Sequence, residues 1–193
     1  MWIPPECRDP IVMHAPTRKS VACFGAVNLS TGRLVSWFCP VFNGETFEAF
    51  TRRLLRHRRP GRRMVLVLDN AAYHHSRLLW PLLQRQRHVL TLLFLPPYSP
   101  QLSTIERVWK LTRRLATHNR YFPTLPAVMD AVSQCFRRWQ RPNENCDAYA
   151  ASLKSLCFAG GDLEGADGVA VADGTVAGTG IGGIAETFNP PHG

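Results

Sequence analysis

Two carboxylates in this sequence stand where they could bind a metal ion together. Asp69 ends the apolar run Met64–Leu68, and Glu106 follows 37 positions later in a segment whose spacing predicts a helix. An acid at the carboxyl end of a buried strand and an acid on a later helix can meet at one edge of a sheet. Carboxylate oxygens suit Mg²⁺, and magnesium held in this way supports phosphoryl transfer.

Each acid also has a simpler interpretation. Asp69 and Asn70 could form a turn, because both side chains bond readily to nearby backbone. Glu106 could pair with Lys110 one helical turn later, on a solvated face. The presence of both segments in one chain favours the metal site.

His74 and His75 follow Asp69 closely. One of them could position a phosphate or a substrate water, or it could cap the next helix. A zinc site is not expected, because no third soft ligand is spaced to join them. Ser76 is more typical of a helix start than of a nucleophile, since no G-x-S-x-G elbow surrounds it.

The elements that must position these residues form an α/β pattern. Two strands joined by a turn at Ser30–Gly32 predict a hairpin. A strand, a helix and a second strand then predict parallel pairing. The expected strands span residues 20–27, 34–39, 64–68 and 89–95, and the expected helices 43–57, 75–87, 104–118 and 125–140. The apolar positions expected to face the core in the helix over 104–118 are Ile105, Val108, Trp109 and Leu115.

Charge divides the chain into two parts. Residues 1–159 hold all 23 Lys and Arg against nine acids, and residues 160–193 hold five acids and ten of the 14 glycines. A surface with a net charge of +14 favours a polyanion such as nucleic acid, although solubility alone would also explain it. The glycine-rich acidic stretch 160–193 is expected to be a disordered tail.

Cysteine usage and hydropathy bear on the compartment. No C-x-x-C pair occurs among the six cysteines, and several of them lie in apolar runs, as buried free thiols do. No secretory signal or transmembrane run is apparent, so we expect a cytoplasmic protein without a membrane partner.

Two segments together resemble the DDE transposases of the mariner superfamily, in particular the bacterial insertion-sequence branch. They are Leu68–Ser76, which reads LDNAAYHHS, and Leu95–Trp109, which reads LPPYSPQLSTIERVW. The resemblance runs from about residue 2 to residue 158. It implies a ribonuclease H-like fold, in which a mixed sheet is flanked by helices, with residues 1–159 as a partial catalytic domain.

The resemblance also implies roles for single residues. Asp69 would be the second catalytic acid and Glu106 the third, together holding Mg²⁺ or Mn²⁺ for DNA strand cleavage and strand transfer. Asn70 and His74 match supporting positions near that site. The implied partners are the transposon ends, the target DNA and a second copy of the chain. Under this interpretation phosphates could be contacted by four cations of one helix: Arg107, Lys110, Arg113 and Arg114.

The chain departs from the family pattern at two places. Ser103–Thr104 replaces the usual Asn-Pro, although Ser and Thr are good helix caps. The first acid of the family lies on a strand before the Trp-x-Pro segment, and here that segment starts at Trp2. Glu6 and Asp9 stand in the wrong context to replace that acid. We therefore expect the central first strand to be missing.

Loss of a central strand should damage the fold and the site. It would deprive two buried neighbouring strands of hydrogen-bond partners, which is costly. The expectation is a truncated and impaired transposase. Two alternatives stay open: a catalytically inactive DNA-binding or dimerisation module, and a basic α/β domain whose acids are only structural.

Overall fold

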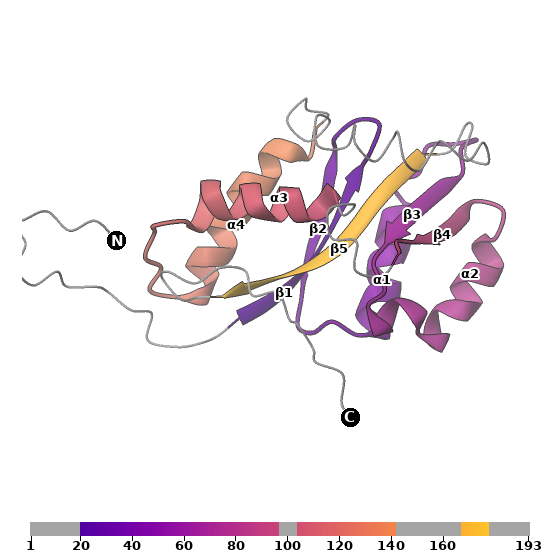
Figure 1. Cartoon of the computed structure of the whole chain (residues 1–193), viewed down its shortest axis with the longest axis horizontal. Coiled ribbons are helices and arrows are strands. Elements are labelled where there is room, and N and C mark those ends of the chain that lie inside the picture. Colours follow the sequence, from indigo (N-terminus) through magenta and orange to yellow (C-terminus); the bar gives the residue numbers. More distant parts are fainter. Residues whose placement is uncertain (1–19, 97–103, 142–166, 178–193) are drawn as a thin grey trace, which may run out of the picture.

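The computed structural model describes residues 20–96, 104–141 and 167–177. They form one five-stranded mixed sheet in the order β2-β1-β5-β3-β4, with helices on both faces (Figure 1). The expected mixed sheet flanked by helices is therefore confirmed. The expectations for the segment that starts at Trp2, for Glu6 and Asp9 and for Ser103 lie outside the described residues.

The hairpin and the first helix follow the sequence pattern. Strands β1 (Ser20–Asn28) and β2 (Leu34–Cys39) pair antiparallel. Helix α1 spans Gly44–Leu55, and Asn43 caps it: Asn43 Oδ1 accepts from the Thr46 N–H at 2.8 Å, and Thr46 Oγ1 accepts from the Asn43 N–H at 3.1 Å. This reciprocal capping satisfies backbone donors that a helix start would otherwise leave unpaired.

The parallel pair also forms where expected. Strand β3 (Met64–Leu68) is fully buried and pairs with β4 (Leu90–Phe94), which lies at the edge of the sheet and is only partly buried. The single helix expected over 75–87 is wrong. Two 3-10 turns, η1 (Ala72–His75) and η2 (Arg77–Leu79), precede a short α2 (Trp80–Gln86). Pro81 explains the late start, because proline suits only the first turn of a helix.

The last two helices cover the other face of the sheet. Helix α3 (Thr104–Thr112) continues into a π-helical turn, η4 (Arg113–Thr117), and α4 spans Leu125–Trp139. The prediction that Leu115 faces the core is wrong: its side chain is 48% exposed, and Ala116 is buried instead. Ala116 follows Ile105 by eleven residues, which is about three turns at 3.6 residues per turn, so it lies on the same face of the helix as Ile105.

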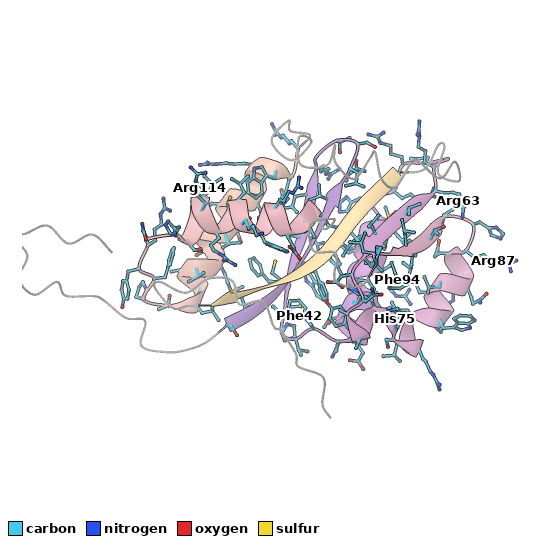
Figure 2. All side chains as sticks on the ribbon, in the orientation of Figure 1. Phe42, Arg63, His75, Arg87, Phe94 and Arg114 are labelled. Atoms are coloured by element: carbon cyan, nitrogen blue, oxygen red, sulfur yellow. The ribbon has the colours of Figure 1, made fainter. Side chains whose placement is uncertain are left out.

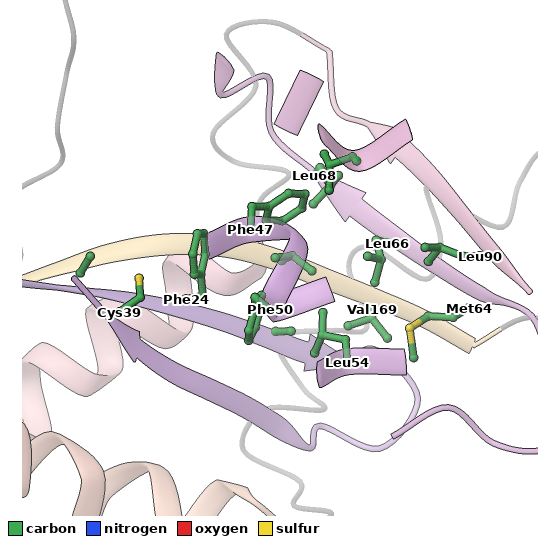
Figure 3. Close-up of a cluster of buried hydrophobic side chains, with 14 residues drawn as sticks. Phe24, Cys39, Phe47, Phe50, Leu54, Met64, Leu66, Leu68, Leu90 and Val169 are labelled. Atoms are coloured by element: carbon green, nitrogen blue, oxygen red, sulfur yellow. The ribbon is translucent and has the colours of Figure 1, made fainter. Parts of the chain in front are cut away.

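Alternate residues of β1 serve two cores. Cys23 and Val27 join the core beneath α3 and α4, whereas Phe24 joins the core beneath α1. Figure 3 shows the second core, where Phe24 meets Phe47 and Phe50 of α1. The rings of Phe24 and Phe50 stack with centroids 5.2 Å apart. Cys23, Cys39 and Cys135 are buried free thiols, as expected.

The centre of the sheet is occupied by a strand from the C-terminal stretch. Strand β5 (Asp167–Ala177) runs antiparallel to β1 and parallel to β3. For these residues the expected disordered tail is wrong, and the expected gap at the centre of the sheet is filled. Two valines two positions apart, Val169 and Val171, are 5% and 2% exposed. Such alternation of β-branched residues is typical of a strand that packs one face on a core.

Candidate active site

Asp69 directly follows the last residue of β3, and two contacts fix the position of its carboxylate. Its Oδ1 accepts a hydrogen bond from the Ala71 N–H at 3.1 Å and lies 3.0 Å from Nδ1 of His74. The same Nδ1 lies 3.1 Å from the Asp69 carbonyl oxygen. One imidazole N–H is thus shared between the side chain and the main chain of Asp69. This arrangement orients the carboxylate and leaves its side chain 45% exposed.

His74 is held in place by packing. The residue is 2% exposed, and its ring centroid lies 4.4 Å from that of Phe47 and 4.4 Å from that of Tyr73. The 3-10 turn η1 brings the histidine back towards Asp69, because the His74 N–H bonds to the Ala71 carbonyl at 2.9 Å. Within the described residues, Nε2 of His74 is buried and has no hydrogen-bond partner. A buried histidine aimed at a carboxylate fits a supporting role at the site.

The surroundings of Asp69 favour its charged form. Burial raises the pKa of Asp69, but the His74 hydrogen bond, the His74 charge and the Ala71 N–H together outweigh burial and leave the pKa below its usual value. Because both hydrogen bonds favour the ionised carboxylate, Asp69 is negatively charged at neutral pH. An anionic oxygen donor is what a divalent magnesium or manganese ion requires.

Asn70 ties the end of β3 to its neighbour. Its side-chain amide donates to the Leu95 carbonyl at 2.8 Å, just after β4 ends. An open pocket of about 510 Å³ begins beside His74. Its lining is mostly apolar and consists of His74, His75, Ser76, Arg77, Leu79, Trp80, Leu83, Leu92 and Phe94. In Figure 2, His75 and Phe94 lie side by side, with ring centroids 4.4 Å apart and nearly parallel.

Glu106 lies near the start of α3, the helix that packs on the other half of the sheet. The residue is partly buried. That helix packs directly on β1 at Gly25: a Cβ added there would lie 2.8 Å from Trp109 Cζ2 and 3.3 Å from Ile105 Cδ1. The glycine therefore lets the helix that carries Glu106 approach the strand closely.

The strand register relates this contact to Asp69. Gly25 pairs with Ala172 of β5, and Val67 of β3 pairs with Ala170. Continuing the β3–β5 register by two residues sets Ala172 level with Asp69. The helix that bears Glu106 thus packs on β1 at Gly25, which the strand register sets level with Asp69. Sequence reasoning missed both Gly25 and β5 as elements of the site. The alternation of Val169 and Val171 was the available signal for β5.

The four cations expected to contact DNA divide into two kinds. Lys110 and Arg114 are exposed, whereas Arg107 and Arg113 are partly buried. Figure 2 shows Arg114 on the side of the molecule covered by α3 and α4, across from Arg63 and Arg87.

Two features are absent from the described residues. No group of three or more His, Cys, Asp or Glu side chains lies close enough together there to hold a metal ion. In the same part of the chain, no helix is long and apolar enough to cross a membrane.

The sequence matches a known protein family over most of its length. A family model described as "DDE superfamily endonuclease" matches residues 1–129. The chain is also 31% identical over 118 residues to the uncharacterized protein y4pE/y4sA of Sinorhizobium fredii, which covers 61% of this chain and 82% of that protein.

Two solved structures share the fold. One is the Mos1 strand transfer complex, with 17% identity, a TM-score of 0.56, and coverage of 81% of this chain and 46% of that chain. The other is the Mos1 transposase paired-end complex with left transposon end, with 18% identity, a TM-score of 0.58, and coverage of 80% and 47%. The chain spans about half the length of these structures.

Proposed function

Because this chain belongs to the DDE superfamily of endonucleases, we propose that it acts in DNA transposition, through metal-dependent cleavage and transfer of DNA strands. Asp69 and Glu106 would hold Mg²⁺ or Mn²⁺, with Asn70 and His74 in supporting roles. The substrates would be transposon ends and target DNA, and a second copy of the chain is a proposed partner. The observation that carries the proposal is the ionised carboxylate of Asp69, fixed by His74 at the carboxyl end of β3.

The proposed role of each residue follows from its position and its contacts. The N–H groups of Ala71 and His74 orient the Asp69 carboxylate, which therefore needs little reorganisation when an ion binds. Asn70 links the ends of β3 and β4, so the loop that carries Asp69 stays in register with the sheet. Glu106 adds a second carboxylate from α3. The bound metal would supply activation of water and of a 3′-hydroxyl, and stabilisation of charge at the phosphate.

Manganese binding tests the site separately from catalysis. We would titrate the full chain with Mn²⁺ and follow the free ion by electron paramagnetic resonance. Asp69→Asn and Glu106→Gln are each expected to weaken binding at least tenfold, because each removes one anionic ligand. Asp130→Asn, on α4, is the matched control for loss of one negative charge and should bind as the unaltered chain does. Equal affinity in all four proteins would refute the proposed metal site.

Cleavage is then tested with supercoiled plasmid, in the presence of Mg²⁺ or Mn²⁺. Nicking that needs the metal and is lost in Asp69→Asn would support a catalytic role. The second candidate is a DNA-binding or dimerisation module without catalysis. One observation favours it: among the residues whose side chains the structure describes, no three His, Cys, Asp or Glu side chains lie close enough together to hold a metal ion. Metal binding without nicking, together with retained DNA binding, would select this second candidate.

A further inference from the structure

Strand β5 is the only hydrogen-bonded link, among the described strands, between two separate pairs. One pair is β1 with β2, and the other is β3 with β4. Strands β1 and β3 are not neighbours in the sheet, because β5 lies between them (Figure 1). Its residues Val169–Ala177 pair with β1, and its residues Asp167–Ala170 pair with β3. Without β5, both β1 and β3 would face an open slot.

The slot and β5 match in their apolar residues as well as in hydrogen bonding. Val169 and Val171 belong to the core that contains Phe24 of β1 and Leu66 of β3. Phe47 and Phe50 of helix α1 belong to the same core. Packing of this kind is non-directional, however, and does not set a register. The register between the two halves is set by the hydrogen bonds of β5, because a slip of one residue would turn every side chain to the other face.

The two proposed metal ligands lie on different halves. Asp69 follows β3, whereas Glu106 lies on α3, which packs on Gly25 of β1. We propose that residues 167–177 act as an internal donor strand, which docks between β1 and β3 of its own chain and sets the position of Glu106 relative to Asp69. The positioning role rests on the proposed function, whereas the docking does not. Strand β5 also carries Asp173, which the register sets opposite Phe24.

Engineered disulfides test the docking and its register. Ser20 pairs with Ala177 at one end of the β1–β5 ladder, so their Cα atoms are within the range that a disulfide spans. Ser20→Cys/Ala177→Cys should form a crosslink within one chain under mild oxidation, located by mass spectrometry of the peptides. Ser20→Cys/Val176→Cys is the control, one residue out of register, and should crosslink at least tenfold less.

Two results would overturn the docking. Equal crosslinking of the matched and the shifted pair would mean that β5 has no fixed register. A crosslink from residue 20 of one chain to residue 177 of another, seen as a dimer on a non-reducing gel, would mean that the donor strand comes from a second copy. These outcomes do not depend on metal or DNA.

A second variant tests the coupling to the site. Val171→Asp places a charge in the core and should release β5, so that amides of β1 and β3 exchange hydrogen at least tenfold faster. Val41→Asp makes the same change at a residue that is 50% exposed and should change neither amide exchange nor Mn²⁺ affinity. If amide protection in Val171→Asp is unchanged, the donor strand is refuted. If protection falls while Mn²⁺ affinity stays as in the unaltered chain, the positioning role is refuted and the docking stands. If the unaltered chain binds no Mn²⁺, the proposed metal site and the positioning role both fail, and the crosslinks still decide the docking.

Discussion

His74 holds Asp69 through a single ring nitrogen, 3.0 Å from its carboxylate oxygen Oδ1 and 3.1 Å from its carbonyl oxygen. One contact orients the acid and the other stabilises the turn that follows β3. The imidazole can do this because Phe47 and Tyr73 fix the plane of the ring. The geometry of the acid therefore depends on the core beneath α1 as well as on its own loop.

Replacement of His74 should separate packing from hydrogen bonding. His74→Ala removes a buried ring and should lower the free energy of unfolding by about 2–4 kcal/mol, as large-to-small core changes do. His74→Phe keeps an aromatic ring at this position but loses the N–H donor, and should cost less in stability than His74→Ala. Both variants should weaken Mn²⁺ binding, because the carboxylate is no longer oriented. Urea unfolding and Mn²⁺ titration check this. A His74→Phe variant with unaltered Mn²⁺ affinity would contradict the orienting role.

Lowering the pH should reveal how much the contacts of Asp69 with His74 and Ala71 stabilise the folded chain. The pKa of Asp69 is lowered in the folded chain, so the unfolded chain takes up the proton first as the pH falls. The stabilisation is therefore fully present above the ordinary value of about 3.9, and it is lost as the pH falls through the lower, folded pKa. Asp69→Asn should lack this part of the acid-induced loss. Urea unfolding at pH 6 and at pH 3 measures it, and identical losses in both proteins would count against the interaction.

The close approach of α3 to β1 predicts a sensitive position on the strand. Gly25→Ala would place a methyl group 2.8 Å from Trp109, so the Trp109 ring or the helix that carries it must shift. Overpacking of this kind costs about 1–3 kcal/mol, and here it should also weaken Mn²⁺ binding by moving Glu106. Ser20→Ala, on an exposed residue of the same strand, is the control. Unfolding and Mn²⁺ titration of both variants check the prediction. A Gly25→Ala variant as stable as the control would show that Trp109 adapts without cost.

Local patterns were enough to predict the hairpin, α1, β3 and α4. In each, a cap, a turn or an apolar period agrees with the tertiary structure; Asn43 and Thr46, for example, form the reciprocal cap of α1. The errors arise where a local signal was misread. Pro81 marks the first turn of α2, and Ala116, rather than Leu115, lies on the helix face that contains Ile105.

The role of β5 could not be predicted from its own composition. Its glycine and acid content is typical of disorder, and only the open slot between β1 and β3 gives Val169 and Val171 a core to pack on. In the site, only the family resemblance implied that His74 lies near Asp69, and its Nδ1 lies 3.0 Å from the Asp69 carboxylate. The position of Glu106 relative to Asp69 depends on the contact of α3 with Gly25 and on the register of β1, β5 and β3. No local sequence pattern contains that register.

The exposed cations of α3 and η4 predict that DNA binds to the side of the molecule that these elements cover. Lys110→Gln/Arg114→Gln removes two exposed charges on the side covered by α3 and α4. If both contact phosphates, the slope of log affinity against log salt should become less steep by about 2, since each neutralised phosphate contributes about 0.9.

Arg85→Gln/Arg87→Gln removes the same charge from the α2 region, and Figure 2 shows Arg87 across the molecule from Arg114. That control should leave the slope nearly unchanged. Binding of a short duplex by fluorescence anisotropy at several salt concentrations measures both. Equal changes would mean that net charge, rather than this face, governs DNA binding.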